Sequence, residues 1–143
     1  MIHSQTFAVA VASASSGKVE LHANHALRLA AEDGSLIAEE WTTLRASPKK
    51  IIEWLESSRF CQAGCKLEAT AFHPDAGRLA SLDRCKNESR PPLSIPKFWE
   101  IGPAVFSFEG GTQIPYWLAM NDASYVPLMV PMAQLAQFAE RLA

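Results

Sequence analysis

Three cysteines and one histidine in the middle of the chain are residue types that bind soft metal ions: Cys61, Cys65, His73 and Cys85. Thiolate and imidazole groups are the usual ligands of zinc. Their spacing, C-x3-C-x7-H-x11-C, matches no common structural zinc site. Three residues separate Cys61 from Cys65, whereas a redox pair has two. The sequence therefore predicts no metal site and no cofactor.

Two further histidines, His22 and His25, are three positions apart. On a helix they would share a face and could hold a metal ion, but on a strand they point to opposite faces. Apolar residues recur at every second position around them, which favours the strand. We therefore expect His25 to be a hydrogen-bonded residue of the core or its rim. A role as a general base is the alternative, since the pKa of imidazole lies near neutrality.

Catalytic motifs are absent from the sequence. There is no nucleophile elbow, no phosphate-binding loop and no G-x-G-x-x-G or H-E-x-x-H pattern. Gly110-Gly111 is interpreted as a turn, because no helix is expected after it. Glu39 and Glu40 are neighbours on an expected strand and would face apart, so they form no acid/base pair. No catalytic residue is predicted.

Aromatic side chains are concentrated in residues 98–125, which contain three acidic residues and no basic residue. Trp and Tyr are favoured anchors of protein interfaces, because they bury a large area with few rotatable bonds. A large apolar patch on a soluble protein usually marks a partner site. The alternative is that the same rings form the core. We predict a partner-binding surface formed by Trp99, Phe106, Phe108, Tyr116, Trp117 and Tyr125.

The length of 143 residues suits one globular domain, residues 1–143. A hydrophobic fraction of 48% and a charged fraction of 20% exclude a disordered chain. No apolar run is long enough for a membrane-spanning helix. The apolar stretch Phe7–Ala12 is short and follows no Lys or Arg, so it does not predict a signal peptide. The odd number of cysteines predicts reduced thiols and a cytoplasmic protein.

The first part of the chain is expected to form strands. Residues 5–12 alternate weakly, and residues 18–32 alternate clearly between apolar and polar side chains. Asp33-Gly34 is a hairpin signal, so a long hairpin is predicted over residues 18–46. A helix over residues 37–44 is the alternative, because Ala, Glu and Leu favour helix.

A helix and a second hairpin are expected next. Ser47-Pro48 is typical of a helix start and predicts a helix over residues 48–58. Alternation over residues 65–72 and the turn residues His73–Gly77 predict a hairpin whose return strand is residues 78–85. Residues 86–97 contain adjacent prolines and are expected to be a loop.

The remaining residues are expected to form strands near 98–101, 104–108, 113–120 and 125–130, followed by a helix over 131–142. Tight turns between neighbouring strands imply antiparallel pairing. The predicted fold class is therefore α+β, with a mostly antiparallel sheet of about six to eight strands built from hairpins and two helices.

Three functions are compatible with these patterns. We expect a non-catalytic protein-binding module (an adaptor, inhibitor, immunity-type protein or small chaperone) that acts through the charge-poor aromatic surface and forms a homodimer or binds another protein. The first alternative is a single-stranded nucleic-acid-binding protein whose aromatic rings stack on bases, although the net charge of −2 opposes it. The second alternative is a small enzyme that uses a His/Cys site. No membrane partner is expected.

Overall fold

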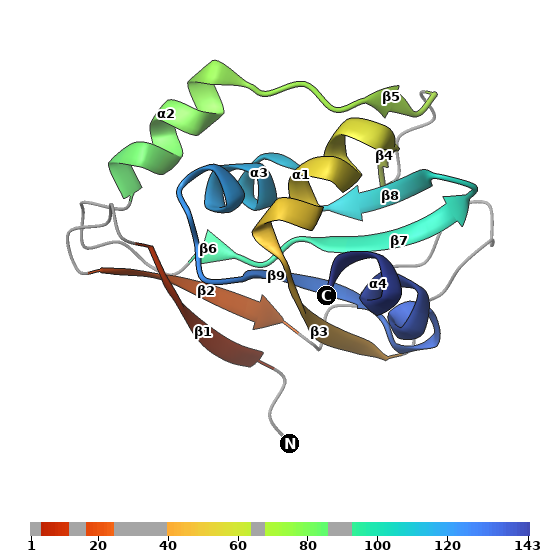
Figure 1. Ribbon diagram of the computed structural model, residues 1–143, viewed down its shortest axis with the longest axis horizontal. Coiled ribbons are helices and arrows are strands. Elements are labelled where there is room, and N and C mark those ends of the chain that lie inside the picture. The colour runs from red at the N-terminus through yellow and green to blue at the C-terminus, as the bar shows by residue number, and fades with distance from the viewer. Residues whose placement is uncertain (1–3, 12–16, 25–39, 64–67, 86–92) are drawn as a thin grey trace.

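The computed structural model describes residues 4–11, 17–24, 40–63, 68–85 and 93–143. Within them the chain forms nine strands in two mixed sheets and four α-helices (Figure 1). Antiparallel pairs predominate, and three pairs are parallel. The predicted α+β class is confirmed, with two helices beyond the two expected. None of the described helices has the length and apolar character needed to cross a membrane.

The smaller sheet has the order β1-β2-β6. Strands β1 (Ser4–Ala10) and β2 (Lys18–Asn24) pair antiparallel, and β6 (Leu93–Ser94) adds to β2 in parallel. Val9, Val19 and Leu21 are buried on one face, as alternation along a half-buried strand requires. The predicted first strand and the start of the second are therefore confirmed.

The larger sheet contains six strands in an order that mixes early and late segments of the chain. The order is β3 (Trp41–Ala46), β9 (Val126–Pro131), β7 (Lys97–Gly102), β8 (Val105–Glu109), β4 (Arg59–Gln62) and β5 (Thr70–Ala71). Every residue of β9 is buried, which suits a central strand. The predicted strands near 98–101, 104–108 and 125–130 are confirmed.

The predicted pairing of the 18–46 hairpin is wrong over the described residues. Strand β3 pairs with β9 of the larger sheet, whereas β2 pairs with β1 and β6. The physical reason is that β9 is apolar on both faces and takes β3 as its antiparallel neighbour. The proposed turn at Asp33-Gly34 lies outside the described residues. The alternative helix is wrong for residues 41–44, which are part of β3.

Helix α1 (Pro48–Ser57) confirms the helix predicted from Ser47-Pro48. The Ser47 hydroxyl accepts a hydrogen bond from the backbone N–H of Lys50 at 3.5 Å, and Pro48 occupies the first helical position. Trp54 is 1% exposed and lies at the centre of the core between α1 and the sheet. Its ring lies 5.0–6.4 Å from four phenylalanine rings: Phe60, Phe98, Phe106 and Phe138.

The C-terminal helix is also confirmed. A 3-10 turn, η1 (Met132–Gln134), leads into α4 (Leu135–Leu142), and Phe138 and Leu142 are buried. The backbone N–H of Ser47 donates to the carbonyl of Leu142 at 2.7 Å. This bond ties the start of α1 to the end of α4.

The predicted return strand over residues 78–85 is wrong, because residues 76–85 form helix α2 (Ala76–Cys85). The Asp75 carboxylate accepts a hydrogen bond from the backbone N–H of Arg78 at 3.0 Å, as an N-cap residue does. Leu79 and Leu82 are three positions apart and share the inner face, where Leu82 is fully buried. Pro74, Asp75 and Gly77 therefore start a helix instead of turning a hairpin.

The predicted strand over residues 113–120 is wrong as well, because it forms helix α3 (Gln113–Met120). Pro115 lies in the first turn, where the backbone N–H groups have no partner within the helix and its missing donor costs little. Gly110 and Gly111 have positive φ angles and precede this helix, so the expectation that no helix follows them is also wrong.

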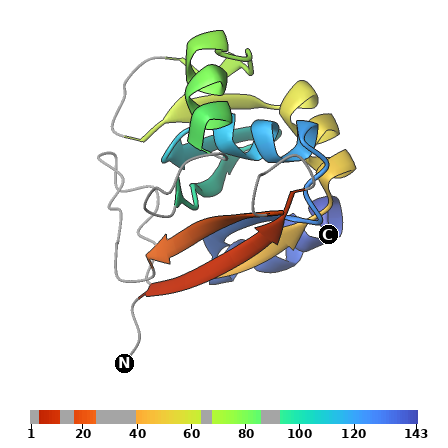
Figure 2. The same ribbon diagram turned by 90° about the vertical axis from the view of Figure 1, so that its left-hand side faces the viewer.

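The helices α1, α3 and α4 lie together on one face of the larger sheet, and α2 lies outside α3 (Figure 1). Figure 2 shows the β1–β2 hairpin and α2 on opposite sides of the molecule. The backbone N–H of Ser124 donates to the carbonyl of Ala10 at 3.0 Å and connects this hairpin to the segment before β9.

Candidate functional site

Three of the six residues predicted to bind a partner are buried within the chain. Trp99 is 4% exposed, and Phe106 and Trp117 are each 2% exposed. Trp99 pairs with Ser107 in the β7–β8 ladder, so it lies on the opposite face of the sheet from Phe106. These three rings are packed in the interior and do not form one common surface.

The other three predicted residues are half-buried. Tyr125 is covered by the guanidinium of Arg45, whose Cζ lies 4.4 Å from the ring centre. The ring of Tyr116 packs against Phe72 at 5.1 Å between ring centres. Phe108 lines a pocket. Two of the six residues, Phe108 and Tyr116, are therefore associated with one concave feature.

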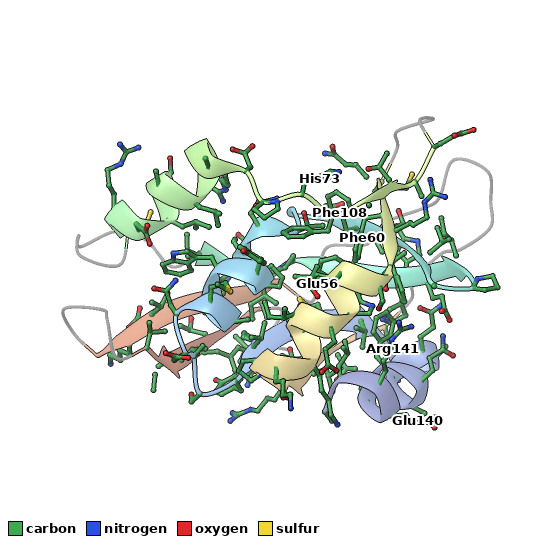
Figure 3. All side chains as sticks on the ribbon, turned by 45° about the horizontal axis from the view of Figure 1, so that its top comes forward. Glu56, Phe60, His73, Phe108, Glu140 and Arg141 are labelled. Atoms are coloured by element: carbon green, nitrogen blue, oxygen red, sulfur yellow. The ribbon has the colours of Figure 1, made fainter. Side chains whose placement is uncertain are left out.

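This feature, named here the phenylalanine pocket, has a volume of about 250 Å³. Strands β4 and β8 run parallel with Gln62 opposite Phe108, so their side chains line one side of it. Phe72, which follows β5, adds an aromatic ring. Phe60 and Phe108 lie close together in Figure 3. The pocket is lined by Phe60, Cys61, Gln62, Glu68, Thr70, Ala71, Phe72, Phe108 and Thr112.

The rim of the phenylalanine pocket includes the edge strand of the larger sheet. Thr70 and Ala71 of β5 are both exposed, and β5 is the last strand in the sheet order. Over the residues that the structure describes, β4 is its one paired neighbour. The Arg59 guanidinium donates to the carbonyl of Ala69 at 2.9 Å and holds the chain that enters β5. An apolar pocket and an exposed strand edge therefore lie side by side.

Two hydrogen-bonded segments support the pocket from outside its lining. The Gln113 side chain donates to the carbonyl of His73 at 3.0 Å and accepts from the backbone N–H of Asp75 at 2.9 Å. These bonds attach the chain after Phe72 to the start of α3. The Ser107 hydroxyl donates to the carbonyl of Cys61 at 3.0 Å.

Lys97 is the buried cation of the larger sheet, with 4% of its surface exposed. Its Nζ atom lies 5.7 Å from the centre of the Trp41 ring, and Trp41 packs edge-on against Trp99 at 5.8 Å. Burial lowers the pKa of the Lys97 amine from its usual value, and the charge of Glu109 acts in the opposite direction. Lys97 does not line the phenylalanine pocket, so we assign it to the packing of this sheet face.

The soft metal ligands that the structure describes do not form a cluster. Cys61 lies in β4 and Cys85 ends α2, and neither forms a disulfide. His73 follows β5, while Cys65 and His25 lie outside the described residues. Across the described ranges, no group of three or more His, Cys, Asp or Glu side chains is placed to hold a metal ion.

No sequence pattern pointed to Phe60 and Phe72 as walls of the phenylalanine pocket. Both precede the aromatic-rich segment 98–125, and only the parallel pairing of β4 with β8 brings Phe60 to Phe108. No local pattern indicates that pairing, since the two strands are more than forty residues apart. Comparison of the chain with models of protein families, with curated proteins and with solved structures finds no match.

Proposed function

We propose that this protein is a non-catalytic protein-binding module, of the adaptor, inhibitor, immunity or small-chaperone kind. Its phenylalanine pocket takes one apolar side chain from an extended segment of the partner. The observation that supports this is the position of a pocket with three phenylalanine rings beside the exposed edge of β5. Phe108 contributes directly, and Tyr116 contributes by packing against Phe72.

The exposed edge explains why the partner segment is extended. An edge strand presents backbone N–H and C=O groups that another strand can pair with. In strand addition, main-chain hydrogen bonds supply affinity and pockets for side chains supply specificity. Thr70 and Ala71 belong both to β5 and to the pocket lining, so one segment reaches both features.

The size of the pocket makes the strand contact necessary. Burying one Leu or Phe side chain contributes roughly 1.5–3 kcal/mol. Binding in the micromolar range needs about 8 kcal/mol. Contacts along β5 must therefore supply a large part of the affinity.

The charge at the pocket favours a partner with a basic residue near its apolar anchor. Glu68 is exposed, and of the described residues that line the pocket it alone carries a formal charge at neutral pH. A Lys or Arg beside the anchoring side chain would approach this carboxylate. Such a pair at an exposed rim acts more on association rate and specificity than on affinity.

Selection from a library of random peptides tests the proposal. The full chain is used as bait, and selected peptides are measured by fluorescence anisotropy against the wild type, Phe72→Ala and Phe108→Ala. Met132→Ala is the matched control, because Met132 is an exposed apolar residue outside the pocket lining. The proposal expects the two pocket variants to lose at least tenfold in affinity, which is about 1.4 kcal/mol, and the control to be unchanged.

Peptides methylated at backbone nitrogens separate the two parts of the proposal. Methylation removes the main-chain donors and keeps the side chains. Loss of binding on methylation supports pairing along β5, whereas unchanged binding contradicts it. Selected peptides whose affinity is insensitive to Phe72→Ala and Phe108→Ala contradict the pocket as the site.

In the homodimeric form of this proposal, the partner is a second copy of the chain. The two β5 edges then pair about a two-fold axis. Light scattering after size-exclusion chromatography distinguishes it: a dimer that dissociates on Phe108→Ala supports self-pairing. If the chain is a monomer, the proposed partner is a different protein. We place the protein in the cytoplasm because its number of cysteines is odd, and localisation of the tagged chain tests that part separately.

A further inference from the structure

A second pocket, separate from the phenylalanine pocket, lies between α4 and the β7–β8 pair and has a volume of about 220 Å³. No residue lines both pockets. This one, named here the charged pocket, has a phenylalanine floor and polar walls. Its lining residues are Glu100, Phe106, Gln137, Phe138 and Arg141.

The wall from β7 carries the half-buried carboxylate of Glu100. The backbone N–H and carbonyl of Glu100 both bond to the side-chain amide of Gln134, at 2.8 and 3.1 Å. One carboxylate oxygen of Glu100 accepts from Nε2 of Gln137 at 2.8 Å. An ionised carboxylate accepts several hydrogen bonds, so Glu100 keeps capacity for a further donor.

The wall from α4 holds a guanidinium. Nη2 of Arg141 donates to the Ser57 hydroxyl at 3.2 Å, and its Cζ lies 6.0 Å from the centre of the Phe106 ring. Figure 3 shows Arg141 on the side of α4 that faces α1, and Glu140 on the far side. A guanidinium has five N–H donors, so the bond to Ser57 leaves most of them for a carboxylate.

The two opposite charges line the same pocket. Each has a partner from another residue: Gln137 for Glu100 and Ser57 for Arg141. A ligand that carries an ammonium and a carboxylate on neighbouring atoms would satisfy both groups at once.

We propose that the charged pocket binds a small free α-amino acid as its zwitterion. The carboxylate of the ligand pairs with Arg141, its ammonium pairs with Glu100, and its side chain meets Phe106 and Phe138. The volume equals that of about seven water molecules in the liquid, which limits the ligand to amino acids of small or medium size. This site does not depend on the protein-binding function proposed above.

Titration calorimetry and protein NMR with the full chain test the site. The probes are glycine, alanine, serine and valine, with N-acetylalanine and alaninamide as analogues that each lack one charge. We expect saturable binding of at least one amino acid in the millimolar range or tighter. Each single-charge analogue should bind at least about tenfold more weakly, because one charge-assisted contact is lost.

Variants on the two walls complete the test. Glu100→Gln and Arg141→Gln should each weaken binding at least about tenfold, whereas Glu140→Gln, which changes an exposed neighbour on α4, should leave it unchanged. Circular dichroism establishes that each variant is folded. Arg141→Lys keeps the charge and is a second variant should Arg141→Gln unfold.

Three results would overturn the proposal. Absence of saturable binding across the millimolar range removes the site. Equal binding of N-acetylalanine and alanine makes it a simple anion site. An equal effect of Glu140→Gln and Glu100→Gln shows that overall charge, and not the pocket, controls binding.

Discussion

The indole Nε1–H of Trp117 donates a hydrogen bond of 2.9 Å to Oδ1 of Asp83 and thereby joins α3 to α2. Trp117 is 2% exposed, so this donor is shielded from water. A buried donor that loses its acceptor costs about 1–3 kcal/mol. The Trp117–Asp83 bond is therefore a main support of α2, whose inner face contributes one fully buried residue, Leu82.

Asp83→Ala should lower the free energy of unfolding by about 1–3 kcal/mol, because the indole N–H loses its partner. Asp83→Asn should cost less, since its amide oxygen still accepts. Urea unfolding followed by fluorescence measures both. Glu53→Ala removes an exposed carboxylate on α1 and is the control, expected within about 0.5 kcal/mol of the wild type. Wild-type stability of Asp83→Ala would contradict this account of α2.

Gly77→Ala should stabilise the protein by about 0.5–1 kcal/mol, because alanine is the better helix former. Gly77 lies in α2, and an added Cβ would meet Asp75 at an ordinary contact distance of 3.5 Å. Thermal unfolding measures the change. Gly110→Ala is the opposite case: Gly110 has φ +99° and an added Cβ would lie 3.1 Å from Cα of Pro96, so this variant should be destabilised. A destabilised Gly77→Ala would favour the hairpin turn that the sequence predicted.

The segment 65–85 shows why a local pattern was misread. His73–Gly77 contains turn-forming residues, and the same residues also start helices. Whether these residues form a turn or start a helix depends on α3. This helix gives α2 a surface to pack on through Trp117. Because residues 113–120 were predicted as a strand and form α3, the sequence offered no helix surface for residues 76–85 to pack on. Two errors in the predicted elements therefore have one common cause.

The elements with strong local signals were predictable. Ser47-Pro48 with the stripe Ile51, Ile52 and Leu55 predicted α1, and the strands predicted near 98–101 and 104–108 lie within one residue of β7 and β8 at each end. The neighbours of each strand were not predictable, since β3 with β9 and β4 with β8 are pairs of distant segments. The candidate site depends on such a pair, and for this reason only Phe108 and Tyr116 were anticipated around it.

Phe106→Ala and Tyr116→Ala should separate core from surface aromatic residues. Phe106 packs against Trp54, Phe60 and Phe138, and its removal should cost about 3–5 kcal/mol. Tyr116 is half-buried against Phe72, so its removal should cost clearly less. Urea unfolding measures both variants. Equal losses would mean that Tyr116 is as much a core residue as Phe106.

Lys97→Met should change how stability depends on pH. Burial lowers the pKa of Lys97 in the folded protein below its usual 10.5, so the unfolded chain binds this proton more tightly. The wild type therefore gains stability as pH rises from the folded pKa to 10.5, and the variant lacks this gain. The stability of Lys97→Met relative to wild type should decline as pH rises through that window. Parallel pH profiles would show that the Lys97 amine titrates as in the unfolded chain.

Cys61 is a lining residue of the phenylalanine pocket and is partly exposed, so the reactivity of its thiol is a probe of the pocket. Cys85, at the end of α2, is partly exposed and outside the pocket, so it serves as the internal control. The measurement is the rate of alkylation of each thiol by iodoacetamide, read by mass spectrometry, with and without a selected peptide at saturation. The account predicts that the peptide slows the reaction of Cys61 and leaves that of Cys85 unchanged. Equal rates at Cys61 with and without bound peptide would contradict occupation of the pocket.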